Sequence, residues 1–365
     1  MIPKNTKSIT PEWLNSVLHK NNFLKKENIT SIICEPCGGG EGLIGDISRI
    51  TVTYDRDGSH LPNTMIAKWH PSDVFFYNLG IQLGFLEKEV RFYSELAPIS
   101  PIRVPELIYS DLDLNSNRFA LLLEDCSKYT SIDLFKGLDY NQTKIAVNTL
   151  ARFHSRWWNA DDLYSFKWLH ENKQSLWSFG YKSFDFYWKF VKKKKEFITD
   201  LPEKGLELGE KYHKKMKNLG FENVPNHYTI IHGDFKIASL FIDTSDLINP
   251  LILFDWGNMH IGFGTFDLAG LLCTSVSVEL RRKFEKHFVK LYMDPLVENG
   301  VDLSDLTFKD FWYNYLRDLI KYIVTLPAQY LLDNYSQRHK EIRKTYIVRI
   351  FSAVLDNDIE KIVPV

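Results

Sequence analysis

The apolar residues of this chain follow two different periods, and the change between them comes near residue 124. Before it, apolar side chains alternate or form short runs, as in 47–54, which is typical of strands. After it, they recur every third or fourth residue, as in 280–291, which indicates amphipathic helices. The sequence therefore predicts an α+β protein in which a small antiparallel sheet precedes a larger, mostly helical part.

The length of 365 residues favours two lobes or domains over one. We expect an N-terminal domain over 1–123 and a helical domain over 124–365. The first contains one main helix, predicted over 82–96 from the spacing of its apolar residues. Inside the second, short apolar runs at 240–242 and 251–254 predict a hairpin joined by a polar turn.

Composition and charge exclude several classes of function. Lys and Arg total 45 against 46 Asp and Glu, a formal net charge of -1, so bulk charge attracts neither nucleic acid nor anionic membranes. No apolar run reaches the roughly 18–20 residues that span a bilayer, and the first residues lack the apolar core of a secretory signal. The Cys34–Cys37 pair lacks the second ligand pair that a zinc site needs. We expect a soluble cytoplasmic protein without nucleic-acid or membrane partners.

A glycine-rich segment is the first candidate for ligand binding. Gly40, Gly42 and Gly45 fit the spacing G-x-G-x-x-G, but an alternating strand follows them where a dinucleotide site needs a helix. A glycine loop between two strands instead resembles the flap that covers ATP phosphates in kinases. Glycines suit such a flap because they let backbone N–H groups approach the phosphate oxygens.

A lysine and a glutamate follow at the positions that such a flap requires. Lys68 lies in a predicted strand over 65–69, and Glu89 lies on the apolar stripe of the helix 82–96. A glutamate on an apolar stripe is costly to bury unless it is paired, which gives a physical reason for a buried Lys68–Glu89 ion pair. The alternative is an edge-strand lysine and a glutamate that merely flanks the stripe; the glycine loop favours the pair.

Two aspartates in the second part end apolar strands. Asp234 follows the run 229–231 in the sequence His-Gly-Asp, and Asp255 follows 251–254 in the sequence Asp-Trp-Gly. Because the outer ends of a hairpin lie side by side, we expect the two carboxylates to meet at one rim. Such a pair indicates a divalent cation or a catalytic base, whereas each aspartate alone is also explained as a solvent-facing strand end.

Together these motifs resemble a known superfamily. The segments HGDFKIASLFID and FDWGNMHIGFGTFDLAGLL are similar to the catalytic and metal-binding signatures of the aminoglycoside phosphotransferase/choline kinase-like superfamily. EVRFY at 89–93 and LLLEDC at 121–126 are most similar to its ecdysteroid-kinase-like branch. The resemblance implies a protein-kinase-like bilobal fold with ATP between the lobes. It also implies a hinge near Glu124 and Cys126 that contacts the nucleotide.

The resemblance implies roles for Asp234, Asp255, Lys68 and Glu89, and the position of Lys236 suggests a further one. Asp234 would accept the proton of the substrate hydroxyl, and Asp255 would hold Mg²⁺ on the ATP phosphates. Lys68, steadied by Glu89, would contact the α- and β-phosphates under the glycine loop. Lys236 is expected to neutralise the transferring phosphate, its alternative being a solvated loop lysine.

Two further residues of these motifs carry structural expectations. Asp267 resembles the family aspartate that supports the catalytic loop, although a helix N-cap explains it equally well. His232 is expected to hold the loop through hydrogen bonds rather than to act as an acid or base.

One position departs from the family's pattern. Ser239 stands where the family has an asparagine that ligates a second Mg²⁺, and the shorter serine reaches an ion less readily. We expect an ATP- and Mg²⁺-dependent phosphotransferase that acts on a hydroxyl of a small molecule, with Asp255 and Ser239 as metal ligands. The alternative is a pseudokinase that binds nucleotide with weak or no transfer.

Overall fold

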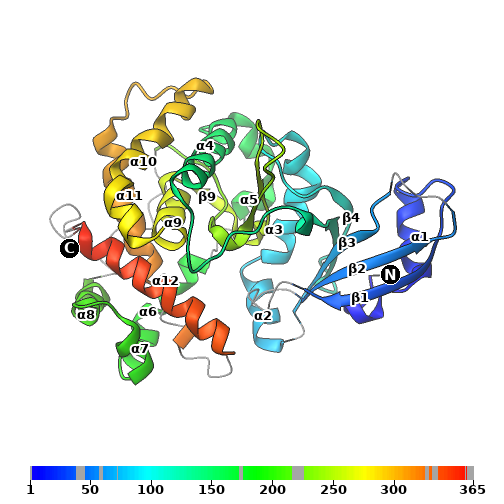
Figure 1. Ribbon diagram of the computed structural model, residues 1–365, viewed down its shortest axis with the longest axis horizontal. Coiled ribbons are helices and arrows are strands. Elements are labelled where there is room, and N and C mark those ends of the chain that lie inside the picture. The colour runs from blue at the N-terminus through cyan, green and yellow to red at the C-terminus, as the bar shows by residue number, and fades with distance from the viewer. Residues whose placement is uncertain are drawn as a thin grey trace. The chain divides into compact units, whose positions relative to one another are not determined.

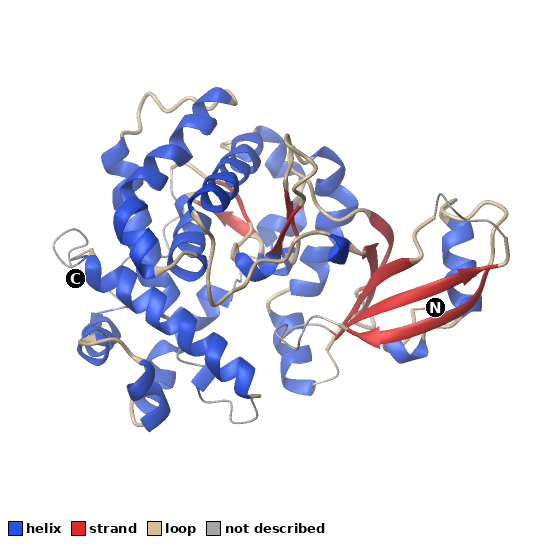
Figure 2. Cartoon of the chain, viewed as in Figure 1, coloured by secondary structure: helices blue, strands red, loops and turns tan. Residues whose placement is uncertain are grey.

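The chain divides by its internal contacts into two compact units. The first comprises Met1–Thr130 and Ile252–Gly257, and the second comprises Ser131–Leu251 and Asn258–Val365. Figure 1 traces the chain, and Figure 2 shows that the long strands gather in the first unit whereas helices make up most of the second. The computed structural model describes residues 2–37, 46–56, 61–71, 73–171, 176–215, 226–324, 329–330, 336–357 and 359.

The described strands of the first unit form a five-stranded antiparallel sheet in the order β1-β2-β3-β5-β4. Their bounds are β1 (Ile29–Pro36), β2 (Asp46–Tyr54), β3 (Thr64–Trp69), β4 (Leu107–Asp113) and β5 (Arg118–Glu124). The alternation in β2 buries Ile50 and Val52 in one hydrophobic cluster with Leu14 and Leu18 of α1 (Pro11–Lys20). Because β3 is the middle strand, Lys68 lies at the centre of the sheet.

The helix predicted over 82–96 begins at Phe85 in the structure. α2 (Val74–Gln82) ends before Gly84, whose positive φ of 66° breaks the helical path. α3 (Phe85–Arg91) begins directly after it and continues as a π-helical turn over Phe92–Leu96. The predicted helix is therefore present over 85–96, and only its start was predicted three residues too early, because an apolar stripe does not reveal a change of backbone direction at one glycine.

Helices make up most of the described part of the second unit. In chain order they are α4 (Tyr140–Trp157), α5 (Lys167–Glu171), α6 (Leu176–Val191), α7 (Lys195–Asp200), α8 (Gly205–Lys215), α9 (Thr265–Ser275), α10 (Val278–Glu298), α11 (Phe308–Ile323) and α12 (Gln337–Asp356). All residues of α9 are buried, and this helix packs against α10, α11 and α12. α9 is thus the core helix of the unit.

Short strands interrupt the helices. β6 (Thr229–Ile231) pairs with β9 (His260–Gly262), and β7 (Leu240–Ile242) pairs with β8 (Leu251–Leu253). The hairpin predicted from 240–242 and 251–254 is therefore present. Its polar turn begins at Asp243, whose backbone N–H donates to the carbonyl oxygen of Pro250 at 2.7 Å.

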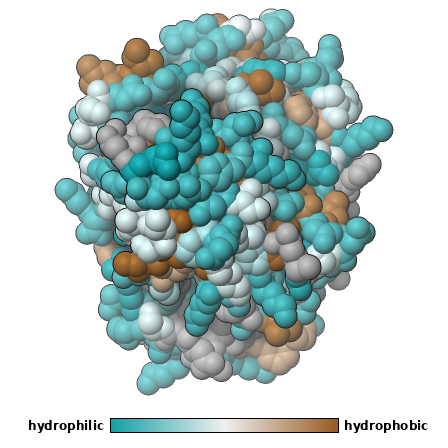
Figure 3. All heavy atoms as spheres, turned by 90° about the vertical axis from the view of Figure 1, so that its right-hand side faces the viewer, coloured by the Kyte–Doolittle hydropathy of each residue, from teal (hydrophilic) through white to brown (hydrophobic). Residues whose placement is uncertain are grey.

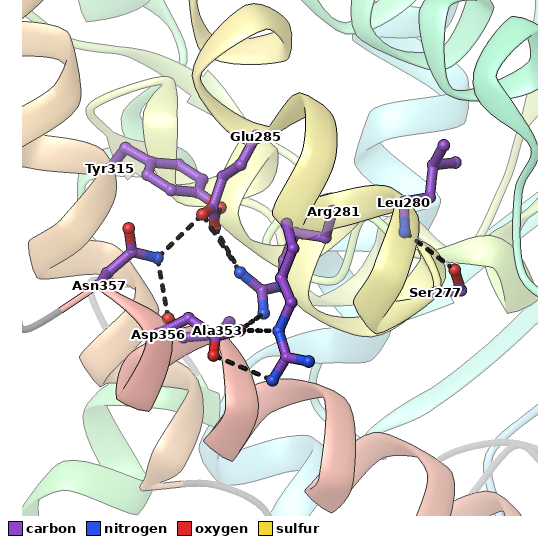
Figure 4. Close-up of polar contacts among 9 residues, drawn as sticks. Ser277, Leu280, Arg281, Glu285, Tyr315, Ala353, Asp356 and Asn357 are labelled. Atoms are coloured by element: carbon purple, nitrogen blue, oxygen red, sulfur yellow. Dashed lines mark hydrogen bonds and ion pairs between the residues drawn. The ribbon is translucent and has the colours of Figure 1, made fainter.

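A network of hydrogen bonds and ion pairs connects the end of α12 to α10 and α11 (Figure 4). Arg281 of α10 is buried and donates to Glu285 on its own helix and to Asp356 at the end of α12. Tyr315 of α11 donates to Glu285 at 2.7 Å, and Asn357 donates to the same carboxylate at 2.9 Å. Because each buried charge has charged and polar partners, the network holds α10, α11 and α12 together without leaving a charge uncompensated.

The face drawn in Figure 3 is mainly hydrophilic. The described hydrophobic residues form only small, separate areas on it, which is ordinary for a protein surface. No helix within the described ranges is long and apolar enough to cross a membrane.

Candidate functional site

Lys68 is the centre of a charged cluster in the first unit. Its side chain is buried, and its Nζ lies 2.8 Å from Oε1 of Glu89 and 2.8 Å from Oδ1 of Asp255. The expected Lys68–Glu89 ion pair is therefore present, and the edge-strand interpretation is wrong. The direct contact with Asp255 was not predicted from the sequence, and it depends on the return of the chain to the first unit at Ile252–Gly257.

The two carboxylates keep Lys68 positively charged. Burial by itself lowers the pKa of a lysine, but the charges of Asp255 and Glu89 outweigh it and raise the pKa of Lys68 above its usual value. Burial raises the pKa of Glu89, which lies deeper in the cluster than Asp255. The cluster therefore offers an ammonium group to an anion such as phosphate and a carboxylate to a cation.

Asp255 is the accessible carboxylate of this cluster. Its side chain is 48% exposed, whereas that of Glu89 is 4% exposed, so an ion arriving from solvent meets Asp255 first. The backbone of Asp255 has φ 71°, a left-handed conformation that is uncommon for residues other than glycine and concentrates at functional sites. Aspartate tolerates this conformation better than most side chains do.

In the second unit, the side chain of Asp267 binds the backbone of the segment around His232. The buried carboxylate of Asp267 accepts hydrogen bonds from the N–H groups of His232 at 2.6 Å and Gly233 at 2.8 Å. Although burial alone would raise it, the hydrogen bond and charge of His154 keep the pKa of Asp267 below its usual value. The loop-supporting interpretation of Asp267 is confirmed. The N-cap interpretation is wrong, because Gly264 is the N-cap of α9.

Gly233 makes the turn that leads into Asp234. It has φ 81°, and a Cβ at this position would lie 2.3 Å from the carbonyl oxygen of Asn258. Asn258 in turn donates to the carbonyl oxygen of Gly233 at 2.7 Å. His232 is buried, and its Nδ1 lies 3.3 Å from the backbone nitrogen of Asp234, which agrees with a structural role. Asn258 is not among the residues predicted from the sequence; its place directly after Asp-Trp-Gly is the signal that points to it.

Asp234 and Lys236 form an ion pair on this loop. The Nζ of Lys236 lies 2.6 Å from Oδ2 of Asp234, and both side chains are partly exposed. The same Nζ lies 5.9 Å from the ring centroid of Tyr346 on α12. Ser239 is buried, and its hydroxyl donates to the carbonyl oxygen of Asp234 at 3.3 Å. Ser239 therefore forms a hydrogen bond within the loop, and its role as a metal ligand stays a prediction.

Of the other predicted residues, three lie outside the described ranges and two lie at or just after the end of β5. Gly40, Gly42 and Gly45 lie outside the described residues. Glu124 ends β5, and Cys126 is buried at the start of a short 3-10 turn. Burial raises the pKa of the Cys126 thiol to about 12, so the thiol stays protonated at neutral pH. Contact of Glu124 and Cys126 with a nucleotide stays a prediction.

The described residues around Asp255 do not form a complete set of metal ligands. Across the ranges that the structure describes, no group of three or more His, Cys, Asp or Glu side chains is arranged to hold a metal ion. A cation at Asp255 would therefore need oxygen ligands from a bound molecule or from water, as Mg²⁺ commonly has. That Asp234 and Asp255 meet at one rim stays a prediction.

Three solved structures with a similar fold are described as aminoglycoside phosphotransferases or as a choline kinase. One is provisionally assigned as an aminoglycoside phosphotransferase from Ralstonia eutropha JMP134, with a TM-score of 0.55, 10% identity, and coverage of 95% of this chain and 96% of that chain. A choline kinase from Cryptosporidium parvum Iowa II has a TM-score of 0.52, 13% identity, and coverage of 90% and 91%. A GDP complex of a mutant aminoglycoside 2'-phosphotransferase-IIIa has a TM-score of 0.51, 15% identity, and coverage of 96% and 99%.

The sequence itself matches one family. None of the curated proteins compared with the chain matches it significantly. The model of the ecdysteroid kinase-like family matches residues 39–304, which include the Lys68 cluster and the loop at Asp234. The chain therefore belongs to the ecdysteroid kinase-like family of small-molecule kinases and has the protein-kinase-like fold of aminoglycoside and choline kinases.

Proposed function

We propose that this protein transfers the γ-phosphate of ATP to a hydroxyl group of a small molecule and uses Mg²⁺ to do so. The observation that carries the proposal is the charged cluster, in which Lys68 is held as an ammonium ion between Glu89 and Asp255. A GDP-bound phosphotransferase and a choline kinase with the same fold support the use of a nucleotide and a hydroxylated acceptor.

The residues of the cluster fit a metal-bound nucleotide. Asp255 would be the metal ligand, because its carboxylate is half exposed while Glu89 is buried against Lys68. Lys68 would bind phosphate oxygens with the charge that its two partners maintain. When bound, Mg²⁺ supplies neutralisation of the charge that develops on the phosphates during transfer.

The residues of the loop fit the transfer step. Asp234 would accept the proton of the acceptor hydroxyl while the hydroxyl oxygen bonds to the γ-phosphorus. The bond between that phosphorus and its bridging oxygen to the β-phosphate breaks, and ADP leaves. Lys236, 2.6 Å from Asp234, would stabilise negative charge on the transferring group. Asp267 and Gly233 would fix the position of the loop, which in-line transfer requires.

A second candidate function is nucleotide binding without efficient transfer. The position of Ser239 favours it, because this side chain is buried and its hydroxyl already donates to the carbonyl oxygen of Asp234. A hydroxyl in that position is a poorer ligand for a second ion than the asparagine of the family's pattern. If this function applies, the wild-type protein binds ATP but releases ADP slowly or not at all, and Ser239→Asn raises the rate of ADP release.

The test is ADP release, measured in a coupled assay with ATP and Mg²⁺. It is run without acceptor and with choline, kanamycin or a polyhydroxylated steroid. We expect turnover with one class of acceptor and a loss of about 100-fold or more in Asp234→Asn. Asp302→Asn, the same change at an exposed loop aspartate that accepts the N–H of Ser304, is the control and should keep full activity. Full turnover in Asp234→Asn would contradict the proposed role of Asp234.

A further inference from the structure

One face of α3 and of the turn after it contacts the Asp-Trp-Gly segment along its length. Phe85, Glu89 and Phe92 follow one another at helical spacing and so lie on one face. A Cβ on Gly257 would lie 3.3 Å from the Cβ of Phe85, so the two elements approach closely there. Glu89 accepts a hydrogen bond from the backbone N–H of Trp256.

A further contact along this face is between two aromatic rings. Phe92 and Trp256 stack with their ring centroids 3.7 Å apart and an interplanar angle of 10°, and both side chains are fully buried. The indole Nε1–H of Trp256 also donates to the carbonyl oxygen of Leu253 at 3.3 Å. Trp256 is therefore fixed by the end of its own strand and by the ring of Phe92.

Asp255 lies between Leu253 and Trp256, and each of these neighbours is held in place by contacts of its own. The strand residue Leu253 is held by its N–H, which donates to the carbonyl oxygen of Arg103 at 3.1 Å. On the other side, Trp256 is held by Phe92 and Glu89. A backbone with φ 71° persists only where its surroundings determine it, and the packing of Trp256 supplies that restraint.

We infer that Phe92 is a positioning residue for Asp255 and acts through Trp256. The inference rests on the proposed function, because the task of Asp255 is defined there as holding the metal ion of the nucleotide. The same helix face carries Glu89, the partner of Lys68, so the phosphate-binding lysine and the metal-binding aspartate depend on one element. A shift of α3 displaces both.

The test compares Phe92→Leu with a matched control. Phe92→Leu keeps an apolar side chain but removes the flat ring that stacks on Trp256. Phe119→Leu is the same change at an equally buried phenylalanine of the same unit, on β5, where the ring contacts His70 with centroids 6.4 Å apart. Phe92→Tyr keeps the ring and is the conservative variant. Thermal unfolding of each variant reports how much general stability the change removes.

Two readouts separate positioning from stability. The first is hydrogen exchange at the Trp256 amide in the nucleotide-free protein, and the second is the gain in ATP affinity on adding Mg²⁺, from calorimetry. In Phe92→Leu we expect faster amide exchange and a gain reduced about tenfold, with ATP affinity in EDTA unchanged within about twofold. Phe92→Tyr and Phe119→Leu should resemble wild type in both readouts.

The inference is overturned if Phe92→Leu matches wild type in amide exchange and in the Mg²⁺ gain, or if Phe119→Leu loses both to the same extent. A wild-type protein whose ATP affinity does not respond to Mg²⁺ refutes the proposed function instead. In that case the exchange of the Trp256 amide still decides whether Phe92 holds the segment. The two failures are therefore distinguishable. If Phe92→Leu does not fold, Phe92→Met makes the same comparison with an unbranched side chain.

Discussion

Replacing Asp267 with alanine should cost the second unit a large part of its stability. The carboxylate is fully buried and accepts the N–H groups of His232 and Gly233 at 2.6 and 2.8 Å. Its removal leaves two buried N–H groups without an acceptor, each at a cost of about 1–3 kcal/mol. The expected loss is therefore about 2–6 kcal/mol, against a total of about 5–15 kcal/mol for a typical domain.

Urea-induced unfolding, followed by circular dichroism without nucleotide, measures this loss. Asp267→Asn keeps one acceptor oxygen but turns an NH₂ group toward the other N–H, so it should lose about 2–3 kcal/mol. Asp302→Asn is the control, because this carboxylate also accepts a backbone N–H but lies in an exposed loop. Its unfolding midpoint should stay near that of wild type. A loss below about 0.5 kcal/mol in Asp267→Ala would refute the reasoning.

Three further changes test other parts of the structure. Gly233→Ala places a Cβ 2.3 Å from the carbonyl oxygen of Asn258 at φ 81°, so it should lower the free energy of unfolding by about 1–3 kcal/mol; an unchanged urea midpoint would contradict this. Glu89→Gln removes one of the two carboxylates that contact Lys68 and should lower the melting temperature. An unchanged melting temperature would contradict this and show that Asp255 alone compensates the buried charge of Lys68. Burial alone would raise the pKa of Asp356, but arginines of α10 keep it below its usual value of about 4. Its stabilising contribution is thus present above that value and is lost as pH falls through the lower folded-state pKa, so the acid-induced fall in melting temperature should be shallower in Asp356→Asn.

Local chemistry explains which parts of the site are predictable from the sequence. The Lys68–Glu89 pair is predictable because a buried glutamate on an apolar stripe needs a cation, and the strand before it supplies one. The support of the loop by Asp267 is predictable from the motif, although only the position of Gly264 excludes the N-cap alternative. The first prediction depends on residue types and spacing, and the second depends on the resemblance to the family.

The remaining features depend on where the folded chain returns. Asp255 contacts Lys68 because the chain re-enters the first unit at Ile252–Gly257, which no periodicity reveals. The break at Gly84 depends on one positive φ, and Phe92, which stacks on Trp256, is the first residue of a π-helical turn. An apolar pattern of period 3.6 does not distinguish such a turn from a continuous helix.

The most direct test of the account is a calorimetric titration of ATP with Mg²⁺ and with EDTA, on wild type and on Asp255→Asn. The variant keeps the size of the side chain but loses the charge that a cation needs. The account predicts that Mg²⁺ strengthens ATP binding to wild type by about tenfold or more, and that the variant loses this gain while its affinity in EDTA stays within about twofold. An equal Mg²⁺ effect in both proteins, or no ATP binding to wild type, would contradict it.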